Sequence, residues 1–348
     1  MKILVVFTGG TIGSTVKNGI ADVDGEASKI LLDICSDYDN AEFEYLSTFN
    51  ILSENANCDT LTRICNFMLD IDYEKYDGVI ITHGSDTLAY TSAMLGLVLS
   101  WVRIPVVITA ADYVLTLPKS NGTENFKASI DFISDFVNGL HNNMGVFTVW
   151  KNKGESVKVY VSTRLNEADG YLDSFTSWGG AEFGVIKNNH FKRTVADINP
   201  KLTMPNEKTA FLRKGKVHFR NDVLLLHSYV GMDFNAVDIS GKSAVLLKLY
   251  HSATFCNDGT GTAFPKFAER CFENGVDVFV YSVKNSEYKY KSVEGMENSW
   301  IIPLYNINTP AAYCKVMLAY AVDVKYRKDI IEINLFYETA DNVRRKQV

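Results

Sequence analysis

The stretch ILVVFTGGTIG, residues 3–13, is a run of apolar and largely β-branched residues that ends at a pair of glycines. A second stretch of the same kind is GVIITHGSDT, residues 78–87. Continuous apolar runs of this length are typical of strands that are buried on both faces of a parallel sheet. Open α/β sheets bind their ligands at the carboxyl ends of the strands, where both stretches carry glycines and hydroxyls. The two stretches therefore predict an α/β fold with a site built from both loops.

The composition favours chemistry on small molecules. The 348 residues are 47% hydrophobic and carry a net charge of -6 with no block of like charge, so we expect neither nucleic acid nor a membrane as a partner. The six cysteines are scattered without metal-ligand spacing, which predicts free thiols and no metal site. The first apolar run is too short for a signal peptide or a membrane span. A cytoplasmic location is the expectation.

The order of strands and helices predicts two domains. Short β-branched runs alternate with helical patterns in residues 1–190, which predicts a larger N-terminal α/β domain around a mainly parallel sheet. Residues 191–220 are polar, contain two prolines and lack a period, so they are expected to form a linker. Alternation resumes in residues 221–348, the smaller C-terminal α/β domain. The expected N-terminal strands are Ile3–Phe7, Phe43–Phe49, Gly78–Thr82, Pro105–Thr109 and Gly145–Trp150, with Val157–Val161 as a half-exposed hairpin strand.

Helices and further strands follow from the same patterns. Helices are expected over residues 59–69, with Asn57 or Asp59 as the N-cap, and over residues 87–99. In the C-terminal domain the expected strands are Val223–His227, Ala244–Tyr250 and Val276–Ser282, and the expected helices are Phe264–Phe272 and Thr309–Ala321. The polar aromatic run Glu287–Lys291 is expected to be a solvated loop.

The glycine pair after the first strand places Thr11 in a sharp turn. Glycines let the backbone turn there and leave N–H groups free to face an anion or a developing oxyanion. A hydroxyl in such a turn is a candidate nucleophile. A dinucleotide-binding loop is excluded because Gly9, Gly10 and Gly13 lack the required spacing, whereas an ordinary tight turn remains an alternative.

The HGSDT segment precedes a helix whose N-terminus attracts negative charge. The positive end of its dipole would point toward a bound anion or toward Asp86. The alternative is that Ser85 or Asp86 simply caps the helix. His83 is expected to be a structural hydrogen-bonding residue rather than a catalytic base.

Together these segments resemble the signature segments of the asparaginase and glutaminase family, which uses a threonine nucleophile. Thr8–Ile12 is similar to the nucleophile loop and His83–Thr87 to the HG(T/S)DT segment. Ser53–Glu54 is similar to the pair that holds the substrate's α-carboxylate. Further along, Ser120–Asn125 is similar to the SDG...N stretch, and Ile302–Pro303 with Thr309–Ala312 to the terminal IP...TPEAA helix start. The resemblance spans nearly the whole chain and implies an asparaginase-like fold.

The resemblance also implies a role for each matching residue. Thr11 would attack the side-chain amide, and Ser85 would stand in the place of the second catalytic threonine. Asp86 would bind the substrate's α-ammonium, and Ser53 with Glu54 would recognise the amino-acid head. Backbone groups at Gly10 and Gly84 would complete the substrate-binding site; no cofactor is implied.

Three residues depart from the family pattern. The family's loop tyrosine has no counterpart between Thr11 and Gly25, where Ile20 lies near the expected place. The family's catalytic lysine aligns with Arg164 or Asn166, neither of which titrates as a lysine does. Lys158 and Arg164 are the basic groups available to replace it. Glu54 stands where an amide or hydroxyl is usual, and its carboxylate would repel a bound α-carboxylate unless it is neutralised. The alternatives are a different substrate, such as one with a free amine or a peptide, and a surface glutamate without a role.

The resulting hypothesis is an amidohydrolase that converts asparagine or a close analogue to aspartate and ammonia through a threonine acyl-enzyme. One alternative is an ammonia-supplying amidotransferase subunit or a peptide amidase. Another is a catalytically impaired protein that still binds the amino acid. The resemblance further implies a homodimer or homotetramer in which the carboxy domain of one subunit, near residues 250–254, completes the site of its neighbour.

Overall fold

The computed structural model describes the chain in two compact units. One consists of Met1–Lys216 with Leu335–Tyr337, and the other of Val217–Asn334 with the residues from Glu338 onward. The structure describes residues 1–340 except 18, 19, 24, 140–142, 202, 214, 261, 284–292 and 294–299, and it omits the side chains of residues 14–17, 20–23, 25, 26, 28 and 48. The expected loop at Glu287–Lys291 therefore lies outside the described residues.

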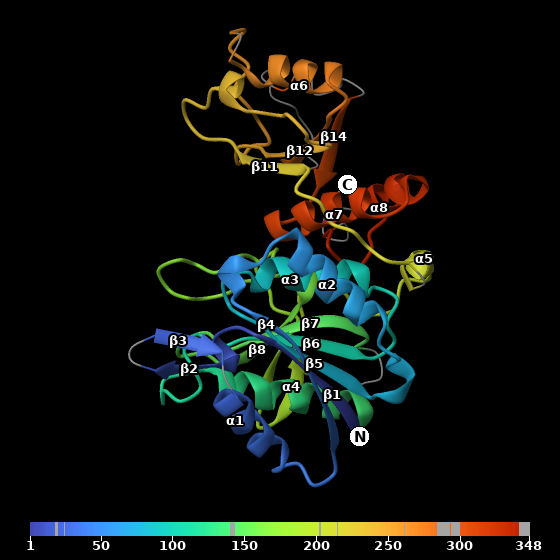
Figure 1. Ribbon diagram of the computed structural model, residues 1–348. Helices are drawn as coiled ribbons and strands as arrows, with labels where there is room; N and C mark the ends of the chain where they lie inside the picture. The colour runs from blue at the N-terminus through green and yellow to red at the C-terminus, as the bar shows by residue number, and fades with distance from the viewer. Residues whose placement is uncertain are drawn as a thin grey trace. The chain divides into compact units, whose positions relative to one another are not determined.

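The first unit is built on an eight-stranded sheet with helices on both faces (Figure 1). The strand order is β10-β9-β8-β7-β6-β5-β1-β4, and the pairs from β7 to β4 are parallel. The strands are β1 Lys2–Gly9, β4 Glu42–Ile51, β5 Gly78–Thr82, β6 Pro105–Thr109, β7 Gly145–Trp150, β8 Val157–Val161, β9 Gly184–Lys187 and β10 His190–Arg193. The strands β5, β6 and β7 are buried along their whole length, as continuous apolar runs require. The mixed α/β fold class is confirmed.

Four longer helices cover this sheet. They are α1 Gly25–Cys35, α2 Cys58–Leu69, α3 Leu88–Val98 and α4 Gly122–Val137. In Figure 1, α2 and α3 lie on one face of the sheet and α1 and α4 on the other. The N-cap of α2 is Asn57, whose side chain accepts a hydrogen bond from the Thr60 amide, so Asn57 rather than Asp59 has this role. Before α1, a short antiparallel hairpin joins β2 Ser14–Lys17 to β3 Ile20–Val23.

The second unit holds a four-stranded parallel sheet in the order β11-β12-β13-β14. The strands are β11 Val223–His227, β12 Ala244–Lys248, β13 Asp277–Val283 and β14 Ile301–Tyr305, and the helices are α6 Phe264–Glu273, α7 Thr309–Ala321 and α8 Arg327–Glu332. Strands β12 and β13 pack their apolar side chains against Phe264 and Phe267 of α6. Asn308 caps α7 by accepting a hydrogen bond from the Ala311 amide.

The polar segment 191–220 carries structure of its own. It contains most of β10 and the short helix α5 Ala210–Arg213, and the division between the units falls after Lys216. Thr209 is buried and its hydroxyl accepts a hydrogen bond from Ser100, 2.8 Å away. A hydrogen bond between polar side chains therefore holds this segment within the first unit. Because such contacts need no regularly spaced apolar residues, the sequence of the segment shows no hydrophobic period.

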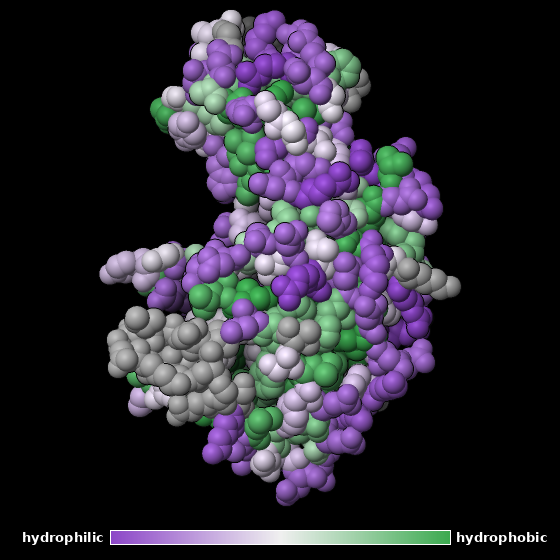
Figure 2. All heavy atoms as spheres, in the orientation of Figure 1, coloured by the Kyte–Doolittle hydropathy of each residue, from purple (hydrophilic) through white to green (hydrophobic). Residues whose placement is uncertain are grey.

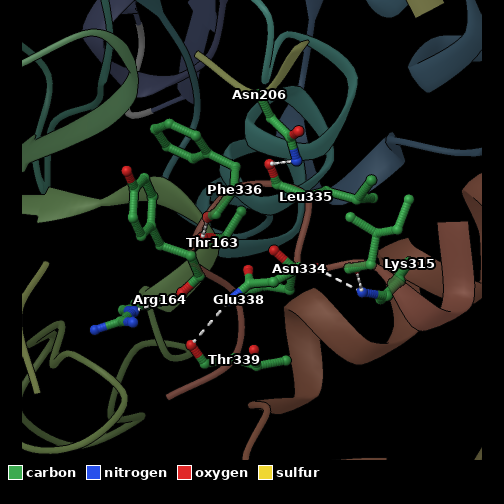
Figure 3. A network of polar contacts seen from close by, with 11 residues as sticks. Thr163, Arg164, Asn206, Lys315, Asn334, Leu335, Phe336, Glu338 and Thr339 are labelled. Atoms are coloured by element: carbon green, nitrogen blue, oxygen red, sulfur yellow. Dashed lines mark hydrogen bonds and ion pairs between the residues drawn. The ribbon is translucent and has the colours of Figure 1, made fainter. Parts of the chain in front are cut away.

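Residues 335–337 belong to the first unit although they lie near the end of the chain. The Thr163 hydroxyl donates to the Phe336 carbonyl at 2.6 Å, and the Asn206 amide donates to the Leu335 carbonyl at 3.0 Å (Figure 3). The Phe336 ring is buried against Gly145, where a Cβ would lie 2.3 Å from the ring. Side-chain to backbone hydrogen bonds and one aromatic ring thus hold this short segment.

The face of the molecule seen in Figure 2 is mainly polar. Figure 2 shows hydrophilic residues over most of the visible face, with hydrophobic residues in separate patches. Within the described residues, no helix is both long and apolar enough to cross a membrane. The same part of the chain contains no group of three or more His, Cys, Asp or Glu side chains arranged to hold a metal ion.

A buried carboxyl on α4 gives the first unit a pH-dependent stability. The Tyr38 hydroxyl donates to Asp131 at 3.1 Å, and burial raises the pKa of Asp131 to about 6, with the neighbouring Asp135 adding to the effect. The Tyr38 hydrogen bond, His190 and Lys127 act in the opposite direction. Ionised Asp131 is therefore less favourable in the folded protein than in the unfolded chain.

We expect Asp131→Asn to stabilise the protein at neutral pH. The pKa of the Asp131 carboxyl is near 3.9 in the unfolded chain and about 6 in the folded protein. Between these two pH values the folded state holds a proton that the unfolded chain has lost, so the free energy of unfolding falls as the pH rises from about 4 to about 6. The variant lacks this loss and should be more stable than the wild type by about 1–2 kcal/mol at pH 8 but not at pH 4. Urea unfolding at both pH values measures it, with exposed Asp39→Asn as the control. Equal pH profiles for wild type and Asp131→Asn would contradict the expectation.

Candidate functional site

The first strand ends in a turn that only glycine accommodates easily. Gly9 and Gly10 have φ values of +102° and +76°. A Cβ on Gly9 would lie 2.6 Å from the backbone nitrogen and oxygen of Ile51, and the Gly10 amide donates to the Ile51 carbonyl at 2.8 Å. The turn therefore packs directly on the end of β4, and both the close approach and the positive φ require glycine.

The same turn meets the loop that follows β5. A Cβ on Gly10 would lie 2.3 Å from the Gly84 nitrogen, and a Cβ on Gly84 would lie 2.3 Å from the Ser53 hydroxyl oxygen. Three segments thus converge at the carboxyl ends of β1, β4 and β5; we call residues 9–11, 51–54 and 83–86 the loop junction. Strands β4 and β5 lie on opposite sides of β1, so the strand order reverses at β1. The loop junction therefore lies at a topological switch point, which is a usual ligand-binding position in α/β sheets.

A hydrogen bond links two of the polar residues in the loop junction. The buried Ser53 hydroxyl donates to Oδ2 of the exposed Asp86 carboxylate at 3.2 Å. The Thr87 hydroxyl donates to the Ser53 carbonyl at 3.2 Å. Thr87 therefore supports the Ser53 turn, a contact that sequence reasoning missed although Thr87 is part of the HGSDT segment. Glu54, beside Ser53, is exposed.

The nucleophile candidate lies at the start of a short 3-10 turn. Thr11 is half-buried, and the turn is closed by a hydrogen bond of 2.9 Å from the Gly13 amide to the Gly10 carbonyl. Ser85, in the opposite loop, is also half-buried. The junction thus offers two partly accessible hydroxyls, a solvent-facing carboxylate and glycine backbone, a set of groups suited to a small polar zwitterion.

Neither Ser85 nor Asp86 caps the helix that follows. The N-cap position of α3 is Thr87, and its side chain makes no capping hydrogen bond. Asp86 instead accepts from Ser53, and the Leu88 amide donates to the Ser85 carbonyl. The carboxylate lies just before the helix N-terminus, which attracts negative charge.

His83 is a buried part of the loop framework. Its backbone amide donates to the Thr109 carbonyl at 2.8 Å, and Nδ1 lies 2.8 Å from the Gly84 carbonyl. Because a carbonyl can only accept, Nδ1 carries the proton. Burial lowers the pKa of His83, so the ring is neutral at physiological pH.

The basic groups near the expected lysine position hold backbone and surface structure. Arg164 is 4% exposed, and its guanidinium donates to the Tyr337 carbonyl at 2.6 Å and to the Ile198 carbonyl at 2.5 Å. Figure 3 shows Arg164 beside the segment that contains Phe336 and Glu338. Lys158 forms an ion pair with Glu155. The structure therefore gives Arg164 a role in anchoring the chain near residue 337.

The SNG segment also has a framework role. Asn121 and Asp112 exchange two hydrogen bonds, each from a backbone amide to the other side chain, at 3.0 and 2.9 Å. Asn125 donates to the Ala110 carbonyl and accepts from the Lys151 amide. These contacts fasten the start of α4 to the carboxyl ends of β6 and β7, next to the strands that carry the loop junction.

Replacing Gly10 by alanine tests the packing of the loop junction. Gly10→Ala combines a left-handed backbone with overlap against the Gly84 backbone, and we expect it to lower the free energy of unfolding by about 3 kcal/mol. Gly154 is a matched control, because its φ is +77° and no atom lies within 4 Å of a Cβ there. Gly154→Ala should cost only about 1 kcal/mol. Equal losses in chemical denaturation would argue against close packing between residues 10 and 84.

Comparison with known proteins agrees with this architecture. A family model described as "Asparaginase, N-terminal" matches residues 2–195. A subunit of the glutamyl-tRNA(Gln) amidotransferase from Methanosphaera stadtmanae is 28% identical over 241 residues, which are 68% of this chain and 52% of that protein. An L-asparaginase from Thermococcus kodakarensis is 32% identical over 142 residues, 40% of this chain and 43% of that protein. The chain thus spans about half the length of these curated relatives.

Solved structures share the fold. The thermostable L-asparaginase from Thermococcus kodakarensis matches with a TM-score of 0.76 over 97% of this chain and 99% of that chain. The sequence identity is 21%, so the likeness concerns the fold. The predicted asparaginase-like fold is confirmed.

Proposed function

Because the chain belongs to the asparaginase family, we propose that it hydrolyses the side-chain amide of asparagine, or of a close analogue, to the acid and ammonia. The observation that carries this proposal is the loop junction. Gly10 and Gly84 lie in backbone contact, so the turn that bears Thr11 adjoins the loop that bears Ser85 and Asp86. A nucleophile, a second hydroxyl and a carboxylate are thereby available to one small substrate.

The proposed reaction proceeds in two steps. The Thr11 oxygen attacks the amide carbon, the carbon–nitrogen bond breaks, and the hydroxyl proton leaves with the ammonia. Water then attacks the acyl-enzyme, its hydroxide joining the carbonyl carbon and its remaining proton returning to the Thr11 oxygen. Ser85 is our candidate for relaying these protons. Arg164 is not a candidate, because a guanidinium stays protonated and this one is bound to backbone carbonyls.

The amino-acid head would be held on the other side of the junction. Asp86 is exposed and anionic, so it suits an α-ammonium group, and Ser53 fixes the orientation of its carboxylate. The backbone at Gly10 and Gly84 leaves room for a substrate to approach closely. Glu54 is exposed, and its carboxylate would disfavour a second negative charge nearby. We therefore propose that Glu54 biases the site toward substrates with a free amine or a masked carboxylate, such as asparaginyl peptides.

A substrate panel tests the proposed reaction. Ammonia and the corresponding acid are measured with L-asparagine, D-asparagine, L-glutamine and asparaginyl peptides. The expected result is one acid released for each ammonia from at least one asparagine compound. If calorimetry shows that asparagine binds but no ammonia is released, the protein would be an amino-acid-binding protein and not a hydrolase. That outcome would agree with an arginine at the expected lysine position.

A second candidate is the supply of ammonia to a partner enzyme. It is favoured by the presence of an amidotransferase component among the relatives that the chain matches. In that case hydrolysis by the isolated chain should be slow, and a second protein should co-purify and raise the rate. A rate that is independent of other proteins would favour the first candidate.

Assembly and location are part of the proposal. We propose a homodimer or a homotetramer, to be measured by light scattering of the purified chain. We also propose a cytoplasmic location, where cysteines that form no disulfide among the described residues would be expected.

A further inference from the structure

A cavity lies beside strand β14 in the second unit. Its volume is about 280 Å³, and no residue of the loop junction lines it. β14 is the edge strand of the four-stranded sheet, and the end of α8 and the residues after it also line the cavity. Most of the wall is aliphatic, and two lining residues carry charge; the residues that matter here are Ile302, Leu304, Ile307, Ile331, Lys315 and Glu332.

The charged group in the interior of this wall is Lys315. It lies in the middle of α7 with its side chain only 3% exposed. Its ammonium donates to the Ile333 carbonyl at 2.5 Å and to the Glu338 carboxylate at 2.6 Å (Figure 3). An ammonium has three N–H donors, and among the described residues only these two accept from it. A buried donor without an acceptor is unfavourable, so an acceptor oxygen in the cavity would be stabilised there.

The charged side chains around the cavity determine which kind of hydrogen-bond acceptor Lys315 can bind there. Lys315 and Glu338 neutralise one another, so a carboxylate would bring an uncompensated negative charge into a buried place. Glu332 is exposed on the wall, and its carboxylate lies 3.8 Å from the ammonium of Lys328 in a pair that water screens. A second cation in the cavity is therefore still attracted to Glu332, and an anion there is disfavoured. A neutral carbonyl oxygen satisfies the third N–H without adding charge. The isoleucines and Leu304 offer an apolar surface for a short branched chain.

We propose that this cavity binds a small aliphatic carboxamide whose carbonyl oxygen accepts a hydrogen bond from Lys315. At about 30 Å³ for each water-sized group, the volume holds about nine such groups, enough for a branched five-carbon amide. A ligand with an added ammonium group binds more tightly through Glu332. This site is independent of the proposed hydrolysis at the loop junction.

Titration calorimetry of the full chain with three probes tests the proposal. Isovaleramide should bind saturably, L-leucinamide should bind several-fold more tightly, and isovalerate at least tenfold more weakly than isovaleramide. Binding of isovaleramide should persist in excess L-aspartate. Isovalerate binding as tightly as the amide, no saturable binding of either amide, or displacement by L-aspartate would each overturn the proposal.

Two variants localise the binding. Ile302→Trp fills the cavity while leaving Lys315 and Glu338 in place, and it should abolish isovaleramide binding. Glu332→Gln removes an exposed carboxylate and its screened pair with Lys328, so it should fold normally and remove the advantage of L-leucinamide over isovaleramide. If Ile302→Trp fails to fold, the Glu332→Gln result decides, and an unchanged L-leucinamide advantage contradicts the assignment.

Discussion

Thr11→Ala is expected to lower kcat for the best amide substrate by roughly 10⁶-fold, the order of loss seen when a serine hydrolase loses its nucleophile. The hydroxyl forms the acyl-enzyme in the proposed route, and no other group in the loop junction supplies an equivalent oxygen at that turn. Thr11 is half-buried and the substitution removes no core packing, so stability should change by less than about 0.5 kcal/mol. Initial-rate measurements of ammonia release check the first expectation, and urea unfolding the second.

The conservative replacement Thr11→Ser keeps a hydroxyl and is the matched control. It should retain a measurable fraction of the wild-type kcat, because a primary alcohol can perform the same attack. Binding of L-aspartate, measured by calorimetry, should be preserved in both variants, since Asp86 and Ser53 hold the amino-acid head. Equal kcat in Thr11→Ala and the wild type would remove Thr11 from the mechanism.

The central strands were predictable because their signal is local. Gly78–Thr82, Pro105–Thr109 and Gly145–Trp150 begin and end at the residues that the apolar runs indicate. Burial on both faces leaves no alternation in such strands, and polar or glycine residues mark their ends. The meeting of residues 10 and 84 was also foreseeable, since parallel strands bring their carboxyl ends to one edge.

Other features depend on contacts between residues far apart in the chain. The sequence predicts Arg164 or Asn166 at the place of the family's lysine, but the guanidinium of Arg164 binds the carbonyl of Tyr337, 173 residues away. Nothing near position 164 indicates that partner. α4 is different, because Phe126, Ile130 and Ile133 recur at helical spacing. That pattern was present in the sequence but was overlooked beside the polar SNG motif at the start of the helix.

Breaking the buried pair of Lys315 and Glu338 is expected to cost about 3–5 kcal/mol of unfolding free energy. The two side chains are 3% and 0% exposed, and their charged atoms lie 2.6 Å apart. Lys315→Met leaves a buried carboxylate without its cation, and Glu338→Gln leaves a buried ammonium without its anion. In the double variant both charges are removed together, so no buried charge is left without a partner. Its loss of unfolding free energy should therefore be smaller than the sum of the two single losses by at least about 2 kcal/mol.

An exposed pair in the same unit provides the comparison. Lys328 and Glu332 lie one helical turn apart on α8, 80% and 63% exposed, with their charged atoms 3.8 Å apart. Water screens this pair, so a cycle with Lys328→Met and Glu332→Gln should give a coupling below about 0.5 kcal/mol. Chemical denaturation of all seven proteins at one pH measures both cycles. Similar couplings for the two pairs would mean that burial adds nothing at Lys315, and the stabilising role of that ion pair would have to be abandoned.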